Sequence, residues 1–132
     1  MMTRLLIVAA GGALGAVARY GVGVGAFRLF PAAQWPWATL TVNVGGGLLM
    51  GLLTGWLAFR GGLHSDSIRL FAAVGLLGGF TTFSAFSLEA ALMIERRQFA
   101  MAGGYAAASV VLSIVARLIG MRVARRAFGA AL

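Results

Sequence analysis

Hydroxyl side chains interrupt long apolar stretches of this sequence at regular intervals. Tyr105, Ser109 and Ser113 recur every four residues, so their hydroxyl groups fall on one face of a predicted helix. A serine in such a helix often bonds back to its own backbone. That explanation is weaker for three hydroxyls headed by a tyrosine. The stripe therefore predicts a polar track for a small ion that sheds its water.

Asn43 lies in the middle of another apolar stretch. An amide there is costly unless it is hydrogen-bonded. One explanation is a structural bond to a neighbouring helix, worth about 0.6 kcal/mol on average in membranes. The other is an N–H donor that faces a permeating anion. The residue alone leaves both open.

The segment Gly78-Gly-Phe-Thr-Thr-Phe-Ser84 combines a flexible point with two β-branched hydroxyl residues. It predicts a helix break, which at membrane depth must be buried in protein or line a cavity. Such a break frees carbonyls for a cation and amides for an anion; a simple glycine kink is the alternative. Phe83 and Phe86 share a face after it, either as plain packing or with electropositive ring edges towards an anion.

Arg19 and Glu89 are the ionisable residues nearest to the interiors of the apolar stretches, where charged groups are costly and usually functional. Arg19 is close enough to a helix end to extend to the membrane surface, so anchoring and ion contact both explain it. Glu89 is either a proton or ion relay or a neutral acid bonded to a neighbour.

Composition indicates that these residues belong to a membrane protein. Of the 132 residues 61% are hydrophobic, the mean hydropathy is +0.93, and only 11 basic and 3 acidic residues are present. A soluble domain of this length could not bury so much apolar surface. The net charge of +8 comes from arginines that flank apolar runs, which favours contact with lipid headgroups over nucleic acid. The lack of cysteine excludes disulfides and thiolate chemistry.

Four apolar runs reach the roughly 20 residues needed to cross a bilayer. We expect one all-α domain over residues 1–132, with spans at about 5–27, 37–59, 68–94 and 99–121. The first run contains Arg4 and resembles a signal peptide, but it lacks a convincing cleavage site and is predicted to be a retained helix. Ser65 or Asp66 is predicted to cap the third helix, and an Arg-rich tail follows Met121.

More of the arginines outside the spans lie on one side of the membrane than on the other. Those on the side of the two termini are Arg4, Arg60, Arg69, Arg122, Arg125 and Arg126, and those on the other side are Arg28, Arg96 and Arg97. This favours cytoplasmic termini, while leaving insertion in both orientations open. Gly47, Gly51 and Gly55 predict a flat strip for close helix packing against an unidentified partner.

Several of these motifs together resemble one family, the Fluc-type (CrcB) fluoride channels, over nearly the whole chain. Besides the hydroxyl stripe, the matching segments are Gly12-Ala-Leu-Gly-Ala-Val-Ala-Arg-Tyr20, Thr39-Leu-Thr-Val-Asn43 and Gly78-Gly-Phe-Thr-Thr-Phe-Ser-Ala-Phe86. The third segment is highly specific. It departs from the family only at Ala85, where threonine is common.

The resemblance implies an all-α integral membrane fold, an antiparallel dual-topology homodimer of four-helix subunits with the third helix broken mid-membrane. It implies a structural Na⁺ at the dimer centre, not transported, held by backbone carbonyls of Gly78 and Thr81. The positions it assigns to the two fluoride pores are Asn43, Phe83, Phe86, Tyr105, Ser109 and Ser113. The positions it assigns to a vestibule or to support are Thr39, Arg19, Thr82, Ser84 and Glu89.

The implied function is passive, electrogenic fluoride export across a bacterial inner membrane. Fluoride enters cells as neutral HF, ionises inside, and leaves as the anion, helped by the negative membrane potential. The expected partners are fluoride, sodium, lipid and a second copy of the chain. The alternative, a small multidrug-type proton-coupled exporter, relies on an acidic residue in the first span, where this sequence has only Arg19. An enzyme is disfavoured because the chain has no His, Cys or carboxylate cluster, and His64 stands alone in a loop.

Overall fold

Four long helices make up the described part of the chain. The computed structural model describes residues 1–33, 35–59 and 65–129, and the predicted turn residues Gln34, Arg60 and His64 lie outside these ranges. The helices long and apolar enough to cross a membrane are Met2–Leu29, Trp37–Leu57, Ser65–Glu95 and Phe99–Gly129. The described residues contain no strand. The predicted all-helical fold with four membrane-capable helices is therefore confirmed.

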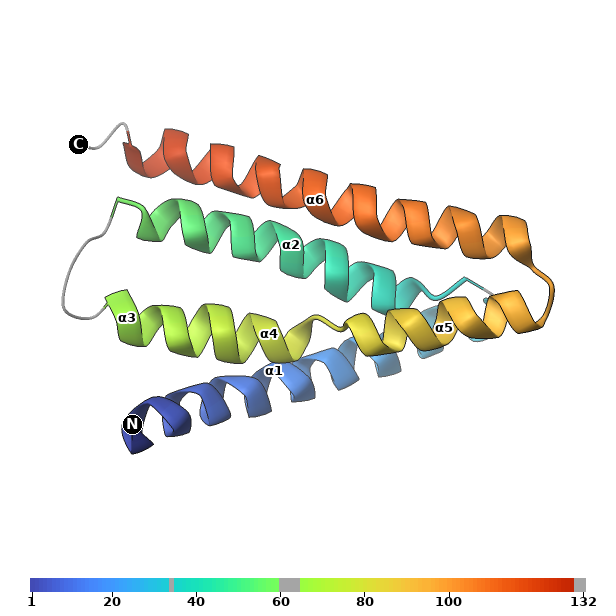
Figure 1. The fold of residues 1–132 in the computed structure, drawn as a ribbon, viewed down its shortest axis with the longest axis horizontal. Helices are drawn as coiled ribbons and strands as arrows, with labels where there is room; N and C mark the ends of the chain where they lie inside the picture. Colours follow the sequence, from blue (N-terminus) through green and yellow to red (C-terminus); the bar gives the residue numbers. More distant parts are fainter. Residues whose placement is uncertain (34, 60–64, 130–132) are drawn as a thin grey trace.

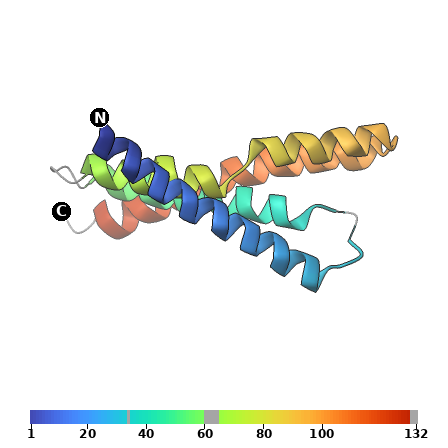
Figure 2. The ribbon, with the colours of Figure 1, turned by 90° about the horizontal axis from the view of Figure 1, so that it is seen from below.

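The third span consists of several segments. They are α3 (Ser65–Ile68), the π-helix η1 (Arg69–Leu77), α4 (Gly78–Phe80) and α5 (Phe83–Glu95). In Figure 1 this span runs in the same direction as α1 (Met2–Leu29), while α2 (Trp37–Leu57) and α6 (Phe99–Gly129) return, so both termini lie at one end. Figure 2 shows α1 diverging from α5 and α6 towards the other end.

Glycines set the distance between α2 and α6. A Cβ atom at Gly47 would lie 2.7 Å from the Ser113 carbonyl oxygen, and one at Gly51 would collide with the Arg117 carbonyl oxygen. From the other side, a Cβ at Gly120 would collide with the Leu48 carbonyl oxygen. The partner of the predicted glycine strip is therefore α6, and these two helices touch through their backbones.

The contact between α1 and the third span is built in the same way. A Cβ atom at Gly75 would lie 2.8 Å from the Val8 carbonyl oxygen, and one at Gly79 would lie 2.6 Å from the Gly12 carbonyl oxygen. Gly15 lies against Leu76 and Phe80. Most of this contact involves η1, whose wider π-helical turns have no clear sequence signal and were not predicted.

Two helix ends differ in detail from the predicted spans. Helix α6 continues to Gly129, beyond the predicted end of the span near Met121, because arginine is a good helix former and the tail contains no breaker. Ser65 and Asp66 lie inside the first turn of α3 rather than before it. The Asp66 carboxylate instead pairs with Arg4 and Arg69, each at 3.1 Å, and so ties the start of the third span to α1.

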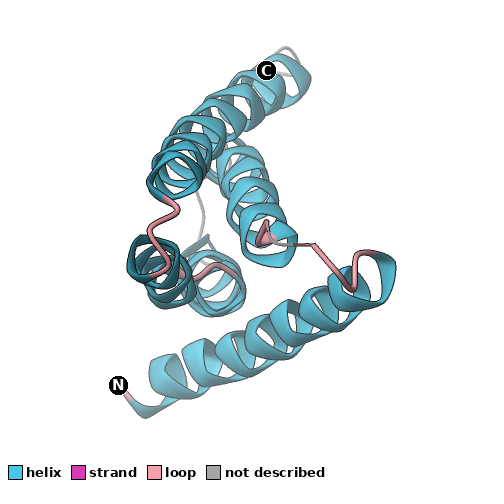
Figure 3. Cartoon of the chain, turned by 90° about the vertical axis from the view of Figure 1, so that its right-hand side faces the viewer, coloured by secondary structure: helices cyan, strands magenta, loops and turns pink. Residues whose placement is uncertain are grey.

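Little of the apolar surface is buried within one subunit. The buried cluster consists of Leu40, Met93, Ala102 and Tyr105. Viewed end on, α1 and α6 lie on opposite sides of α2 and the third span, and their outer faces are uncovered (Figure 3). Along α6 even Val110, Leu118 and Ile119 are about half exposed. Such a surface is stable in lipid and not in water.

Candidate functional site

Two residues in extended conformation separate α4 from α5. Thr81 has φ −78° and ψ 156°, and Thr82 has φ −150° and ψ 122°. The Thr82 hydroxyl accepts a hydrogen bond from the Ala85 backbone N–H at 3.2 Å and so caps α5. The Thr81 backbone N–H and hydroxyl both donate to the Leu77 carbonyl at 3.0 Å. Gly78 and Gly79 remain helical, and Gly79 serves the close contact with α1.

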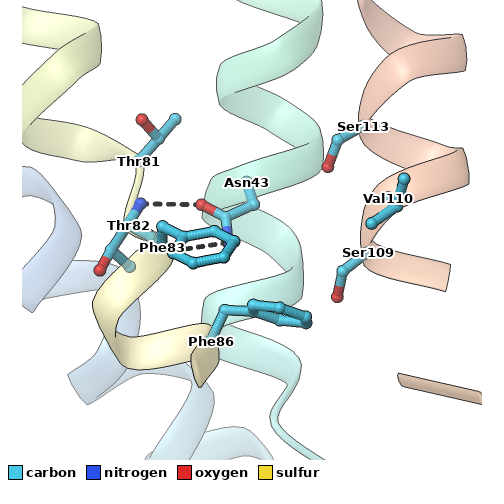
Figure 4. Close-up of a pocket in the computed structure, with 8 residues that line it drawn as sticks. All are labelled: Asn43, Thr81, Thr82, Phe83, Phe86, Ser109, Val110 and Ser113. Carbon is cyan, nitrogen blue, oxygen red and sulfur yellow. Dashed lines mark hydrogen bonds between the residues drawn. The ribbon is translucent and has the colours of Figure 1, made fainter. Parts of the chain in front are cut away.

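Asn43 holds this extended link from α2. Its amide nitrogen donates to the Thr82 carbonyl at 3.0 Å, and its amide oxygen accepts from the Thr82 N–H at 2.8 Å (Figure 4). The side chain thereby pairs with a backbone peptide much as a neighbouring strand would. A primary amide has two N–H groups, and this pairing uses only one of them. The two explanations left open by the sequence are therefore compatible.

The pairing with Asn43 also changes what the nearby carbonyls do. In a continuous helix the Gly78 carbonyl would accept from the Thr82 N–H, and the Thr81 carbonyl from the Ala85 N–H. Here the Thr82 N–H donates to Asn43, and the Ala85 N–H donates to the Thr82 hydroxyl. The carbonyls of Gly78 and Thr81 have thus lost their usual helical donors.

A pocket of about 300 Å³ lies between this link and α6. Its lining residues are Asn43, Thr81, Thr82, Phe83, Phe86, Ser109, Val110 and Ser113, and none of these is charged. Ser109 and Ser113 face Asn43 and the two rings across the pocket (Figure 4). The ring centroids of Phe83 and Phe86 are 5.5 Å apart. The pocket is open to the outside of the subunit, where Phe83 is 79% exposed.

The serine hydroxyls of this pocket are unused. The Oγ atoms of Ser109 and Ser113 are buried and have no hydrogen-bond partner among the described residues. The alternative in which each hydroxyl bonds back to its own helix is therefore wrong for this structure. Buried polar groups are normally satisfied, so two residues that line the pocket carry hydroxyl groups without a partner.

Tyr105 belongs to the same sequence stripe but lies outside the pocket lining. Its side chain is fully buried, and its hydroxyl donates to Glu89 Oε2 at 2.6 Å. Thr39 donates to Glu89 Oε1 at 2.8 Å, so this carboxylate joins α2, α5 and α6. The Tyr105 ring packs 5.2 Å from that of Phe86 and 5.7 Å from that of Trp35. Tyr105 thus packs against Phe86, which lines the pocket, without lining the pocket itself.

Arg19 and Glu89 line a second pocket of about 230 Å³ next to the first. Thr39 and Thr82 also line it, so it shares Thr82 with the first pocket. Arg19 Nε is buried and has no hydrogen-bond partner among the described residues. The two ionisable residues singled out in the sequence therefore come together on one side of the extended link.

The remaining predicted residue, Ser84, is exposed and lies 3.2 Å from the Thr82 hydroxyl through its own hydroxyl. Two residues of the site were missed in the sequence. Val110 lines the pocket between the two serines, and Trp35 packs edge-on against Tyr105. Val110 follows Ser109 directly and gave no signal of its own, because it is one apolar residue among many.

The fold and this site can be compared with known proteins. Residues 6–121 match the family described as CrcB-like protein, Camphor Resistance (CrcB). The chain belongs to the CrcB family. The resemblance expected from the sequence motifs is thereby confirmed.

Close relatives of this CrcB-family protein carry a common name. A protein of a Caulobacter species is 61% identical over 127 residues, which cover 96% of this chain and 98% of the relative. Proteins of Caulobacter vibrioides and Phenylobacterium zucineum are 58% and 54% identical over the same length, with 96% of this chain and 99% of each relative covered. All three are named fluoride-specific ion channel FluC. This CrcB-family protein is accordingly a multi-pass protein of the bacterial inner membrane.

Proposed function

We propose that this CrcB-family protein is a passive, fluoride-specific ion channel that exports fluoride and lowers its concentration in the cytoplasm. The observation that carries this proposal is the pocket with unused hydroxyl donors at Ser109 and Ser113 and no charged lining residue. Fluoride is small and strongly hydrated, so it crosses a membrane only where several donors replace its water. The names of the close relatives support the same conclusion.

The pocket lining is suited to bind an anion weakly enough for the anion to be released again. The spare N–H of Asn43, the serine hydroxyls and the electropositive edges of Phe83 and Phe86 supply partial positive charge. A full positive charge in the lining would hold the ion too tightly for rapid conduction, because binding in a channel must stay weak enough for release. This arrangement moves an ion and does no bond chemistry, so the protein is a channel and not an enzyme.

The conducting unit is an antiparallel, dual-topology homodimer. The pocket is open on a face with strongly exposed Phe83, and in a lone subunit lipid chains would cover it. A second copy that covers this face turns each open pocket into a closed path. The weak arginine imbalance between the two sides is compatible with insertion in both orientations.

The extended link lies near the middle of the membrane, at the centre of this dimer. Thr81 and Thr82 are close to the midpoint of the span Ser65–Glu95. Non-helical backbone at that depth must be buried in protein or line a cavity. Contact with the second copy and with the pocket satisfies this requirement.

The carbonyls of Gly78 and Thr81 fit a structural sodium ion. Both have lost their helical donors, since the Thr82 and Ala85 N–H groups bond elsewhere. Sodium is a hard cation that prefers oxygen ligands, and two carbonyls from each of two copies would supply four. A bound sodium ion would offset the negative ends of the Gly78 and Thr81 carbonyl dipoles. It is not transported.

One flux measurement tests the function. Purified protein is reconstituted in liposomes loaded with potassium fluoride, and valinomycin is added to carry the compensating potassium. We expect fluoride efflux, followed with a fluoride electrode, to need valinomycin and to exceed chloride efflux many times over. Efflux that needs a pH gradient or an organic cation would indicate a proton-coupled exporter instead, for which α1 contains no acidic residue.

A further inference from the structure

The polar stripe of α6 does not end at Ser113. Arg117 is the next residue at the same four-residue interval, and it also stands seven residues after Val110. Ser113 and Val110 both line the pocket. Positions four and seven residues apart share a helix face, so Arg117 lies on the pocket-lining face of α6, one turn beyond the last serine.

Arg117 is also deep in the membrane. Gly46 lies against the Thr81 side chain and Gly47 against the Ser113 carbonyl, which places these residues in one layer near the middle of the spans. Arg117 is four residues further along α6, about 6 Å from this layer. The hydrocarbon core extends about 15 Å from its centre, so the Arg117 backbone lies well inside it.

The direction of the side chain argues against simple anchoring at the membrane surface. In an α-helix each Cα–Cβ bond tilts towards the N-terminus, and a side chain covers the turn before its own Cα. For Arg117 that turn contains Ser113. To reach the surface near the C-terminus, the side chain would have to bend away from its natural direction.

The described residues offer no free acidic side chain as a counter-ion for Arg117. The three acidic residues of the chain are Asp66, Glu89 and Glu95. Asp66 pairs with Arg4 and Arg69, and both Glu89 oxygens accept hydrogen bonds. Glu95 ends α5 at the end of the bundle away from the termini (Figure 1). A guanidinium at this depth needs an anion or water.

We propose that Arg117 attracts fluoride to the end of the hydroxyl track at Ser113, opposite to the end where Arg19 lies. This inference rests on the proposed channel function. Arg117 lies next to the pocket rather than in its lining, so its charge raises the local concentration of fluoride without holding the ion in the narrowest part. The track then runs between two arginines on opposite sides of the Thr81 layer.

Flux through matched variants tests this role. R117Q should lower the initial rate at low fluoride about tenfold, because it removes a unit charge several ångströms from the path. R117K should retain most of the rate, and raising the ionic strength should reduce the difference between R117Q and wild type. R122Q is the control, since it removes the same charge from the opposite face of α6. Equal rates for R117Q and R122Q would overturn the proposal.

A second measurement does not depend on fluoride transport. Because the chain has no cysteine, R117C carries a single thiol, which a water-soluble, membrane-impermeant thiol reagent should modify in liposomes. V115C is the control, because Val115 lies at similar depth on the opposite face and is 44% exposed. An unmodified R117C would overturn the proposal even if wild-type flux is normal. A wild-type protein without fluoride flux would refute the channel function, and labelling would then still decide whether Arg117 lies on a water-accessible path.

Discussion

Replacing Asn43 by aspartate changes one hydrogen bond and one charge at the extended link. The aspartate can still accept from the Thr82 N–H, which now bonds at 2.8 Å. It cannot donate to the Thr82 carbonyl, which now receives the amide N–H at 3.0 Å. One bond is lost and a part-buried carbonyl is left without its donor, at a cost of about 1–3 kcal/mol in the free energy of unfolding.

The effect of N43D on conduction should be at least as large, in free energy, as its effect on folding. Asn43 lines the pocket, so a carboxylate there would lie roughly 5 Å from a fluoride ion. With an effective dielectric constant near 20, two like charges at that distance repel by about 3 kcal/mol. This corresponds to a flux on the order of 100-fold lower. The measurement is best made at about pH 8, well above the ordinary carboxyl range.

N43A separates the two effects. Alanine removes both bonds to Thr82, so N43A should be less stable than N43D, by about 1–2 kcal/mol. It brings no negative charge, so its fluoride flux should be higher than that of N43D. We therefore expect the order of thermal stability to be wild type, N43D, N43A, and the order of flux to be wild type, N43A, N43D. If flux simply follows stability, Asn43 acts only as a structural link.

Two further substitutions test the packing and the pocket. G51A should destabilise the subunit by about 1–3 kcal/mol in thermal unfolding, because its methyl group collides with the Arg117 carbonyl, whereas G45A on the same helix meets nothing within 4 Å and should be neutral or slightly stabilising; equal effects would refute backbone contact between α2 and α6. S109A and S113A should each lower fluoride flux about tenfold or more, as expected for one hydrogen bond to an ion, and should leave the melting temperature unchanged because neither hydroxyl has a partner among the described residues. A lower melting temperature with normal flux would assign these hydroxyls to packing.

Local patterns in the sequence were sufficient for the helices and for part of the site. Apolar runs of bilayer length predicted the four long helices, because hydropathy depends on composition alone. The four-residue interval brought Ser109 and Ser113 together correctly. The same interval wrongly grouped Tyr105 with the two serines, because a four-residue step turns about 40° beyond a full helical turn. Over two steps this drift moves Tyr105 from the pocket towards Glu89.

The position of the extended link depends on contacts that are distant in sequence. The glycine pair at Gly78 and Gly79 suggested a break there, but both residues are helical and Gly79 packs against Gly12. The extended residues come two positions later, where Asn43, 39 residues away in the chain, pairs with Thr82. No local pattern contains such a pair. The π-helix η1 was also missed; it packs against α1, a contact that is likewise distant in sequence.

The same side chain thus positions the backbone and contributes to the pocket, which explains why asparagine is suited to position 43. A residue here must accept from the Thr82 N–H and donate to the Thr82 carbonyl at 2.8 and 3.0 Å. Aspartate lacks the donor, and serine has a single hydroxyl that cannot span both backbone groups. Glutamine has both groups but adds a methylene, so its amide would not meet both Thr82 groups from the same backbone position. Asparagine also retains a second N–H after pairing, so in the proposed channel the group that fixes the link can also offer a donor to fluoride.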